Sequence, residues 1–161
     1  MDVFSSTFHT AAEAGSVSLP TANRHLSIFK NCVDQDDPAV LVARCTRSGP
    51  LSAGCHLLLT ERRLVVIRQT WPLRRLRLHL IANLRHLCNV NWRLDLAKPA
   101  VELSATAMDG ERERFRMRLG STDAVWRAEE LLQRVFEGRR GEQVAVAGRA
   151  SRRPAPAVAL A

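Results

Sequence analysis

Among the residues that could bind a ligand or take part in catalysis, the arginines are the most strongly clustered in the sequence. Residues 51–100 hold nine Arg or Lys and two acidic residues, whereas the rest of the chain is nearly balanced. Guanidinium groups match phosphates and carboxylates in charge and geometry, so this region predicts an anion-binding site. The candidate residues are Arg62, Arg63, Arg68, Arg74, Arg75 and Arg77.

A second interpretation of the same arginines stays open. Outward-facing charges on alternating strand positions keep one face of a sheet solvated and protect its edges. The chain also contains 22 Arg and only two Lys, a bias typical of GC-rich bacterial genomes. This bias in amino-acid composition would by itself explain part of the positive charge.

Histidine and cysteine side chains do not form a recognisable catalytic or metal-binding motif. The sequence has no CxxC pair, no HExxH, no GxSxG and no Gly-rich phosphate loop. His56, His79 and His86 lie near Cys55 and Cys88 in the sequence, but a catalytic Cys–His pair also needs a third partner and an oxyanion site, which proximity in the sequence does not provide. We therefore expect no catalytic residue, no metal and no cofactor, with reduced thiols at Cys32, Cys45, Cys55 and Cys88.

The apolar runs are short. None approaches the roughly 20 residues that a membrane-spanning helix needs, and the first residues lack the apolar core of a signal peptide. We expect a cytoplasmic protein, with peripheral association at the inner membrane as a further option.

The elements that must position the arginines are predicted as follows. Residues 1–17 are expected to be irregular, residues 18–137 to form a single domain, and residues 138–161 to form a disordered basic tail. Helical spacing of apolar residues predicts a helix over 19–33 and a closing helix from Ser121 or Thr122 to Gly138.

Between these helices, alternation with a period of two residues predicts β-strands. Asp109-Gly110 favours a tight hairpin between the last two strands. Leu76, Leu78 and Leu80 are expected on one face of their strand, with the intervening residues on the other. Residues 81–87 stay ambiguous, and the strands are expected near 39–47, 54–60, 63–70, 73–80, 90–96, 100–107 and 114–119.

The segment from Leu57 to Ile67, with its apolar run, Thr60-Glu61-Arg62-Arg63-Leu64 turn and second apolar run, resembles bacterial pleckstrin-homology-like (PH-like) and GRAM-like domains. The later Asp109-Gly110 turn, Phe115 and the closing helix match the same pattern, which covers roughly residues 36–137. The resemblance implies an α+β, mainly β fold. Its form is a curved antiparallel two-sheet sandwich or barrel of about seven strands, capped by a C-terminal helix, here with an extra N-terminal helix.

The resemblance and the charge together predict a non-catalytic binding or scaffolding module. The expected partner is an acidic protein or an anionic membrane surface. The alternative is a nucleic-acid-binding protein that uses the Arg-rich strands and the basic tail, including Arg149, Arg152 and Arg153. The low aromatic content of 5% weakens that alternative, because single-stranded nucleic acids are usually bound by base stacking.

Overall fold

Seven antiparallel strands form one continuous sheet in the order β4-β3-β2-β1-β7-β6-β5. The computed structural model describes residues 2–47, 54–70, 73 and 75–150, with the side chains described up to residue 137. The strands are β1 (Ala39–Arg47), β2 (Cys55–Thr60), β3 (Arg63–Thr70), β4 (Arg75–Asn83), β5 (Cys88–Asp95), β6 (Ala100–Thr106) and β7 (Arg112–Arg118).

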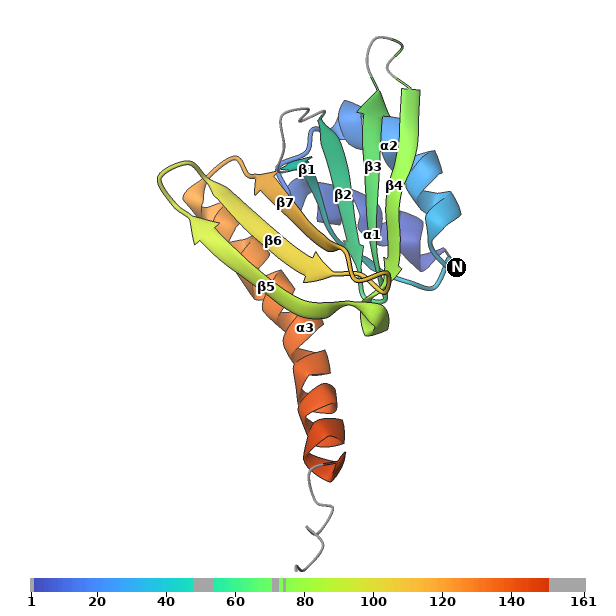
Figure 1. The fold of residues 1–161 in the computed structure, drawn as a ribbon. Coiled ribbons are helices and arrows are strands. Elements are labelled where there is room, and N and C mark those ends of the chain that lie inside the picture. Colours follow the sequence, from blue (N-terminus) through green and yellow to red (C-terminus); the bar gives the residue numbers. More distant parts are fainter. Residues whose placement is uncertain (1, 48–53, 71–72, 74, 151–161) are drawn as a thin grey trace, which may run out of the picture.

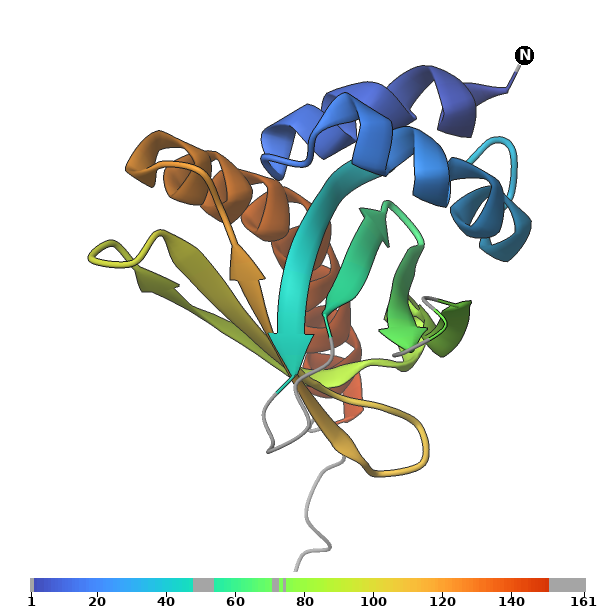
Figure 2. The same ribbon diagram turned by 90° about the horizontal axis from the view of Figure 1, so that it is seen from above.

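The sheet bends at β1, which separates it into two layers. β1 pairs with β2 over most of its length, but with β7 only over Arg44–Arg47. Strands β5 to β7 therefore turn away from strands β1 to β4 (Figure 2). This is the curved, mainly β architecture that the resemblance to PH-like domains implied.

Three helices cover the sheet on different sides. Helices α1 (Val3–Ala14) and α2 (Leu19–Cys32) lie along the outer face of β1 to β4, and α3 (Thr122–Ala150) packs inside the bend (Figure 1). A short 3-10 helix, Leu84–His86, connects β4 to β5. Among the described residues, none of these helices is both long and apolar enough to span a membrane.

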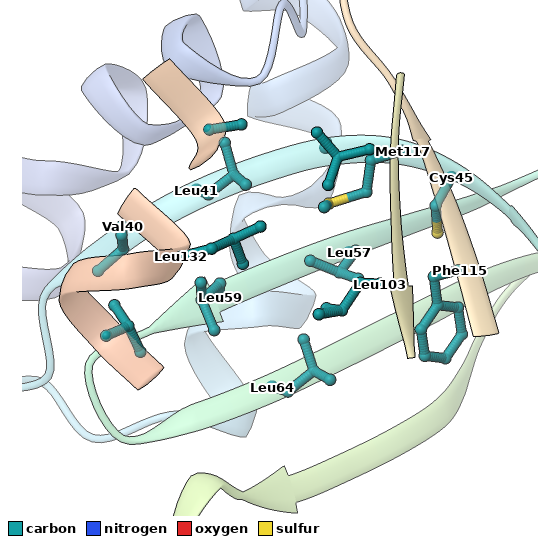
Figure 3. Close-up of a cluster of buried hydrophobic side chains, with 14 of the residues drawn as sticks. Val40, Leu41, Cys45, Leu57, Leu59, Leu64, Leu103, Phe115, Met117 and Leu132 are labelled. Carbon is teal, nitrogen blue, oxygen red and sulfur yellow. The ribbon is translucent and has the colours of Figure 1, made fainter. Parts of the chain in front are cut away.

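Two apolar clusters hold these layers together. The first lies between the inner face of the sheet and α3, and includes Leu41, Leu103 and Leu132 (Figure 3). The second lies between the outer face and the first two helices, and includes Phe8, Phe29 and Leu58. Strands β1 to β3 are apolar on both faces because they are covered on both sides.

The prediction of an irregular segment over residues 1–17 is wrong, because α1 occupies most of it. Asp2 caps the helix by accepting a hydrogen bond from the Ser5 backbone N–H at 2.9 Å. Phe4, Phe8 and Ala11 share the face that packs on the sheet. At Gly15 the chain passes so close to β1 that a Cβ would overlap the Val42 carbonyl group. The Ser and Thr content concealed this apolar spacing.

The predicted alternation in the fourth strand is also wrong beyond its middle. Val66 pairs with Leu80, but the next residue of β3, Ile67, pairs with Leu78, so β4 contains a bulge at His79. Leu80 consequently packs in the first cluster and Leu76 in the second. One extra residue in the pairing reverses the faces of the side chains that follow it.

The other boundaries were predicted within about two residues, except that β4 continues to Asn83 and that two further expectations at element ends are wrong. Leu96, expected to point inward at the end of its strand, is exposed. The closing helix continues through Gly138 to Ala150, so residues 138–150 are helical and not a disordered tail. Gly138, Gly141 and Gly148 each cost about 1 kcal/mol inside a helix, whereas the Arg, Glu, Gln and Ala residues between them favour it. The remaining tail, 151–161, lies outside the described residues.

Candidate functional site

The predicted arginine cluster separates into two groups at opposite ends of strands β2 to β4. Arg62 and Arg63 lie at the β2–β3 turn, whereas Arg68, Arg75 and Arg77 lie toward the β3–β4 connection. These two ends are at the bottom and the top of the hairpins in Figure 1. Arg74 lies outside the described residues.

At the lower end, which we call the Thr60 end, both arginines already have partners. The Arg62 guanidinium donates two hydrogen bonds of 3.2 Å to the carboxylate of Asp36. Arg63 donates to the Cys32 carbonyl at 2.8 Å and pairs with Asp34 at 3.4 Å. Both side chains therefore join the turn to the segment before β1, and their charges are compensated within the chain.

Thr60 organises this end. Its hydroxyl donates to Asp37 Oδ2 at 2.6 Å and accepts from the backbone N–H groups of Arg62 at 3.2 Å and Arg63 at 2.8 Å. Burial raises the pKa of Asp37, although the Thr60 hydroxyl acts in the opposite direction. The Thr-x-x-Arg pattern noticed in the sequence is thus a structural feature of a buried turn.

At the upper end, Arg68 of β3 lies directly opposite Arg77 of β4, and Thr70 lies opposite Arg75. Residues paired in this way share a face and lie about 5 Å apart between Cα atoms. All three arginines are exposed. Within the described residues, no carboxylate lies within ion-pair distance of them. Like charges placed opposite each other are unfavourable, so this end is suited to an external anion.

Arg47 of β1, which the sequence did not single out, and Glu113 of β7 join this end from other strands, beside His79 of β4. Arg47 Nη2 lies 3.4 Å from Glu113 Oε2, and His79 Nε2 lies 3.4 Å from Glu113 Oε1. His79 lies on the same inner face as Arg75 and Arg77, as alternation along the strand predicts. We call Arg47, Arg68, Arg75 and Arg77 the basic end; Glu113 is a single carboxylate beside four arginines.

The neighbouring Cys and His residues are not arranged for nucleophilic catalysis. Cys55 points into the core, and its thiol donates to the Cys45 carbonyl at 3.1 Å. The adjacent His56 necessarily faces the opposite side of the strand. Interaction with Cys55 and burial raise the pKa of Cys45, which keeps this thiol protonated. Among the described residues, no group of three or more Cys, His, Asp or Glu gathers as a metal site would require.

Among known proteins, the chain resembles solved structures only. No protein-family model and no curated protein matches the chain. One similar structure is that of the PDZ-RhoGEF DH/PH domains in complex with GTP-gamma-S-activated RhoA, with 18% identity and a TM-score of 0.48, covering 80% of this chain and 36% of that chain.

Two further structures give similar values. The DH/PH fragment of PDZ-RhoGEF in complex with human RhoA has 16% identity and a TM-score of 0.49, covering 84% of this chain and 40% of that chain. The DH/PH domains of p115-RhoGEF have 17% identity and a TM-score of 0.45, covering 78% and 37%. The chain thus spans well under half the length of each, and its function has to be argued from its own residues.

Proposed function

We propose that this domain is a non-catalytic binding module that docks on an anionic membrane surface through the basic end. The observation that carries the proposal is the pairing of Arg68 with Arg77, two exposed arginines opposite each other without a carboxylate within ion-pair distance in the described chain. Each basic residue close to an anionic membrane contributes about 1 kcal/mol to association.

An exposed leucine favours a membrane over an acidic protein as the partner. Leu73 lies in the β3–β4 connection next to these arginines and is 69% exposed. A projecting apolar side chain beside several cations matches the boundary between lipid headgroups and acyl chains. An acidic protein surface would bind the arginines through its carboxylates, and the exposed Leu73 side chain would contribute little to that contact.

Vesicle sedimentation tests the proposal. The full chain is expected to sediment with phosphatidylcholine vesicles that contain phosphatidylserine, but not with phosphatidylcholine alone, and added salt should release it. The double variant Arg68→Gln/Arg77→Gln should bind roughly thirtyfold more weakly, from the contribution of about 1 kcal/mol for each arginine.

The matched control is Arg62→Gln/Arg63→Gln, which removes the same charge from the Thr60 end. This variant should bind anionic vesicles nearly as well as the wild type, because its arginines are already paired. Equal sedimentation with neutral and anionic vesicles would exclude the membrane. Binding to polyglutamate without binding to vesicles would instead identify an acidic protein as the partner.

The other predictions have no comparable support in the described residues. For nucleic acid, Trp92 is engaged within the fold, since its indole N–H donates to Glu129 at 3.0 Å and its ring packs near Phe136. The side chain of Arg149 is not described, and Arg152 and Arg153 lie outside the described residues. Nucleic-acid binding, a bacterial origin, a GRAM-like family and a cytoplasmic location stay predictions.

A further inference from the structure

A second set of basic side chains lies on the outer face of the sheet, the face opposite to the basic end. Arg44 of β1 is directly opposite His56 of β2 on one side and Arg118 of β7 on the other. Three such neighbours span about 10 Å and point to the same side of the sheet. The sequence did not indicate this row, because its members are separated by as many as 74 positions.

The histidine of this row is buried and lacks hydrogen-bond partners. His56 is 9% exposed, and its ring stacks on that of His25 from α2, with centroids 4.0 Å apart. His25 is 3% exposed, and its Nδ1 lies 2.8 Å from the Thr21 carbonyl oxygen. Both ring nitrogens of His56 and Nε2 of His25 have no partner in the described chain. Buried polar atoms without a hydrogen-bond partner are rare in folded proteins and need an explanation.

The charges around His56 are all of one sign. The pKa of His56 is lowered to about 4, chiefly by burial and in addition by the neighbouring His25, Arg44 and Arg24. These are the charged or titratable groups that α2 and β1 bring close to it, and β7 adds Arg118. Such a group is electrostatically unfavourable without a negative charge to compensate it.

The row opens into a cavity of about 470 Å³, within the usual size range of small-molecule sites. We call it the Arg44 pocket; no residue that lines it in the described chain is acidic. Besides the row itself, Gln69 contributes an amide. The wall is closed where the Gly120 backbone N–H donates to the Ser16 hydroxyl at 2.8 Å.

We propose that the Arg44 pocket binds a phosphate group, free or as a phosphomonoester, through the guanidinium groups of Arg44 and Arg118 and the imidazole of His56. A tetrahedral dianion offers several acceptor oxygens in different directions, which suits donors that converge from three strands. It would also compensate the one-signed charge and supply a partner for the buried ring. Because α2 forms part of the surroundings through His25, the pocket depends on the N-terminal helices.

The test is calorimetric titration of the full chain, at constant ionic strength, with inorganic phosphate and with glycerol 3-phosphate. The wild type is expected to bind at least one of them. Arg44→Gln/Arg118→Gln should weaken binding at least tenfold, whereas the matched pair Arg68→Gln/Arg77→Gln in the basic end should not change it. Sedimentation with phosphatidylcholine vesicles containing phosphatidic acid distinguishes a lipid headgroup from a soluble phosphate.

Binding in any of these three arms that depends on Arg44 and Arg118 supports the proposal. The proposal is overturned if no binding in any arm depends on Arg44 and Arg118, or if binding of inorganic phosphate or glycerol 3-phosphate is lost with Arg68 and Arg77 instead. Since these readouts use different residues from the phosphatidylserine experiment, either proposal can fail while the other holds.

A measurement on the wild type keeps the test valid if the double variant does not fold. The His56 ring proton resonances should shift when sulfate is added, and sulfate affinity should rise from pH 8 to pH 6, because a bound dianion favours protonation of the imidazole groups. The variant His56→Gln should show a weaker pH dependence. Unchanged His56 resonances at saturating sulfate would overturn the assignment.

Discussion

The Thr60 end and the basic end are two ends of the same strands, and they use the same residue type in opposite ways. At the Thr60 end, the segment before β1 brings Asp34, Asp36 and Asp37 onto the β2–β3 turn. At the basic end, Glu113 is the one carboxylate that the described chain places beside the arginines, and it contacts Arg47 rather than Arg68 or Arg77. One end is closed on itself, and the other is open to a partner.

This difference shows that the density of arginine is a poor guide to function by itself. Arg62 and Arg68 are six positions apart in one Arg-rich stretch and look equivalent in the sequence. What distinguishes them is whether a carboxylate from elsewhere in the chain folds against them. The free arginines, and not the most densely clustered ones, are the candidates for binding.

The largest expected effect comes from breaking the closed end. Thr60→Val removes the hydrogen-bond donor to buried Asp37 and the acceptor for two backbone N–H groups. Unsatisfied buried groups cost about 1 to 3 kcal/mol, so the free energy of unfolding should fall by about that amount in chemical denaturation. The control is Thr70→Val at the basic end, where the hydroxyl makes an exposed bond to the Arg75 carbonyl and its loss should matter little. Equal losses for the two variants would contradict the comparison.

A smaller effect is expected from closing the open end. Thr70→Glu places a carboxylate directly opposite Arg75, as Asp36 is placed against Arg62 at the other end. Neutralising one arginine should weaken sedimentation with phosphatidylserine vesicles about fivefold, following a contribution of about 1 kcal/mol per basic residue. Thr70→Gln, of the same size but uncharged, should bind like the wild type. If both variants bound equally, the charge of this end would not be what the membrane recognises.

The smallest effect is a contrast in pH dependence between two neighbouring carboxyl groups. Burial raises the pKa of Asp37 above its ordinary value of 3.8, so its ionisation in the folded state reduces stability as the pH rises through the folded pKa. The Arg62 guanidinium lowers the pKa of Asp36, so this group stabilises the fold above pH 3.8 and loses that contribution as the pH falls through its folded pKa.

Melting temperatures measured across the acidic range check this contrast. Relative to the wild type, Asp37→Asn should become more stable as the pH rises above 3.8, because the variant has no buried carboxylate to ionise. Asp36→Asn should change in the opposite direction over the lower part of the range, because it lacks the ion pair that forms there. Parallel curves for the two variants would contradict the assigned environments.

Local signals explain which parts of the fold were predictable. β1 and β3 have the bounds that their runs of apolar and β-branched residues and the flanking turns indicated, because such runs and turns are properties of neighbouring residues. α1 was missed although Phe4, Phe8 and Ala11 have helical spacing. Thr7 fits into this helix because its hydroxyl donates to the Val3 carbonyl and accepts from the Ala39 N–H. Local propensity was overridden there by packing on the sheet.

The bulge in β4 and the Arg44 pocket had no comparable local signal. A bulge is defined by how two strands pair, and Leu80 joins the first cluster only because the pairing between Val66 and Ile67 shifts by one residue of the partner strand. The row of Arg44, His56 and Arg118 requires β1 to lie between β2 and β7. No window of the sequence contains that information.

The sequence alone determines that short antiparallel strands are followed by a closing helix. It also determines that the positive charge is concentrated in the middle of the chain. Which arginines are paired, and which remain available, was decided only by the tertiary structure. The physical reason is that periodicity and turn chemistry act between neighbouring residues, whereas Arg62 and Asp36, 26 positions apart, meet only after the strands have packed.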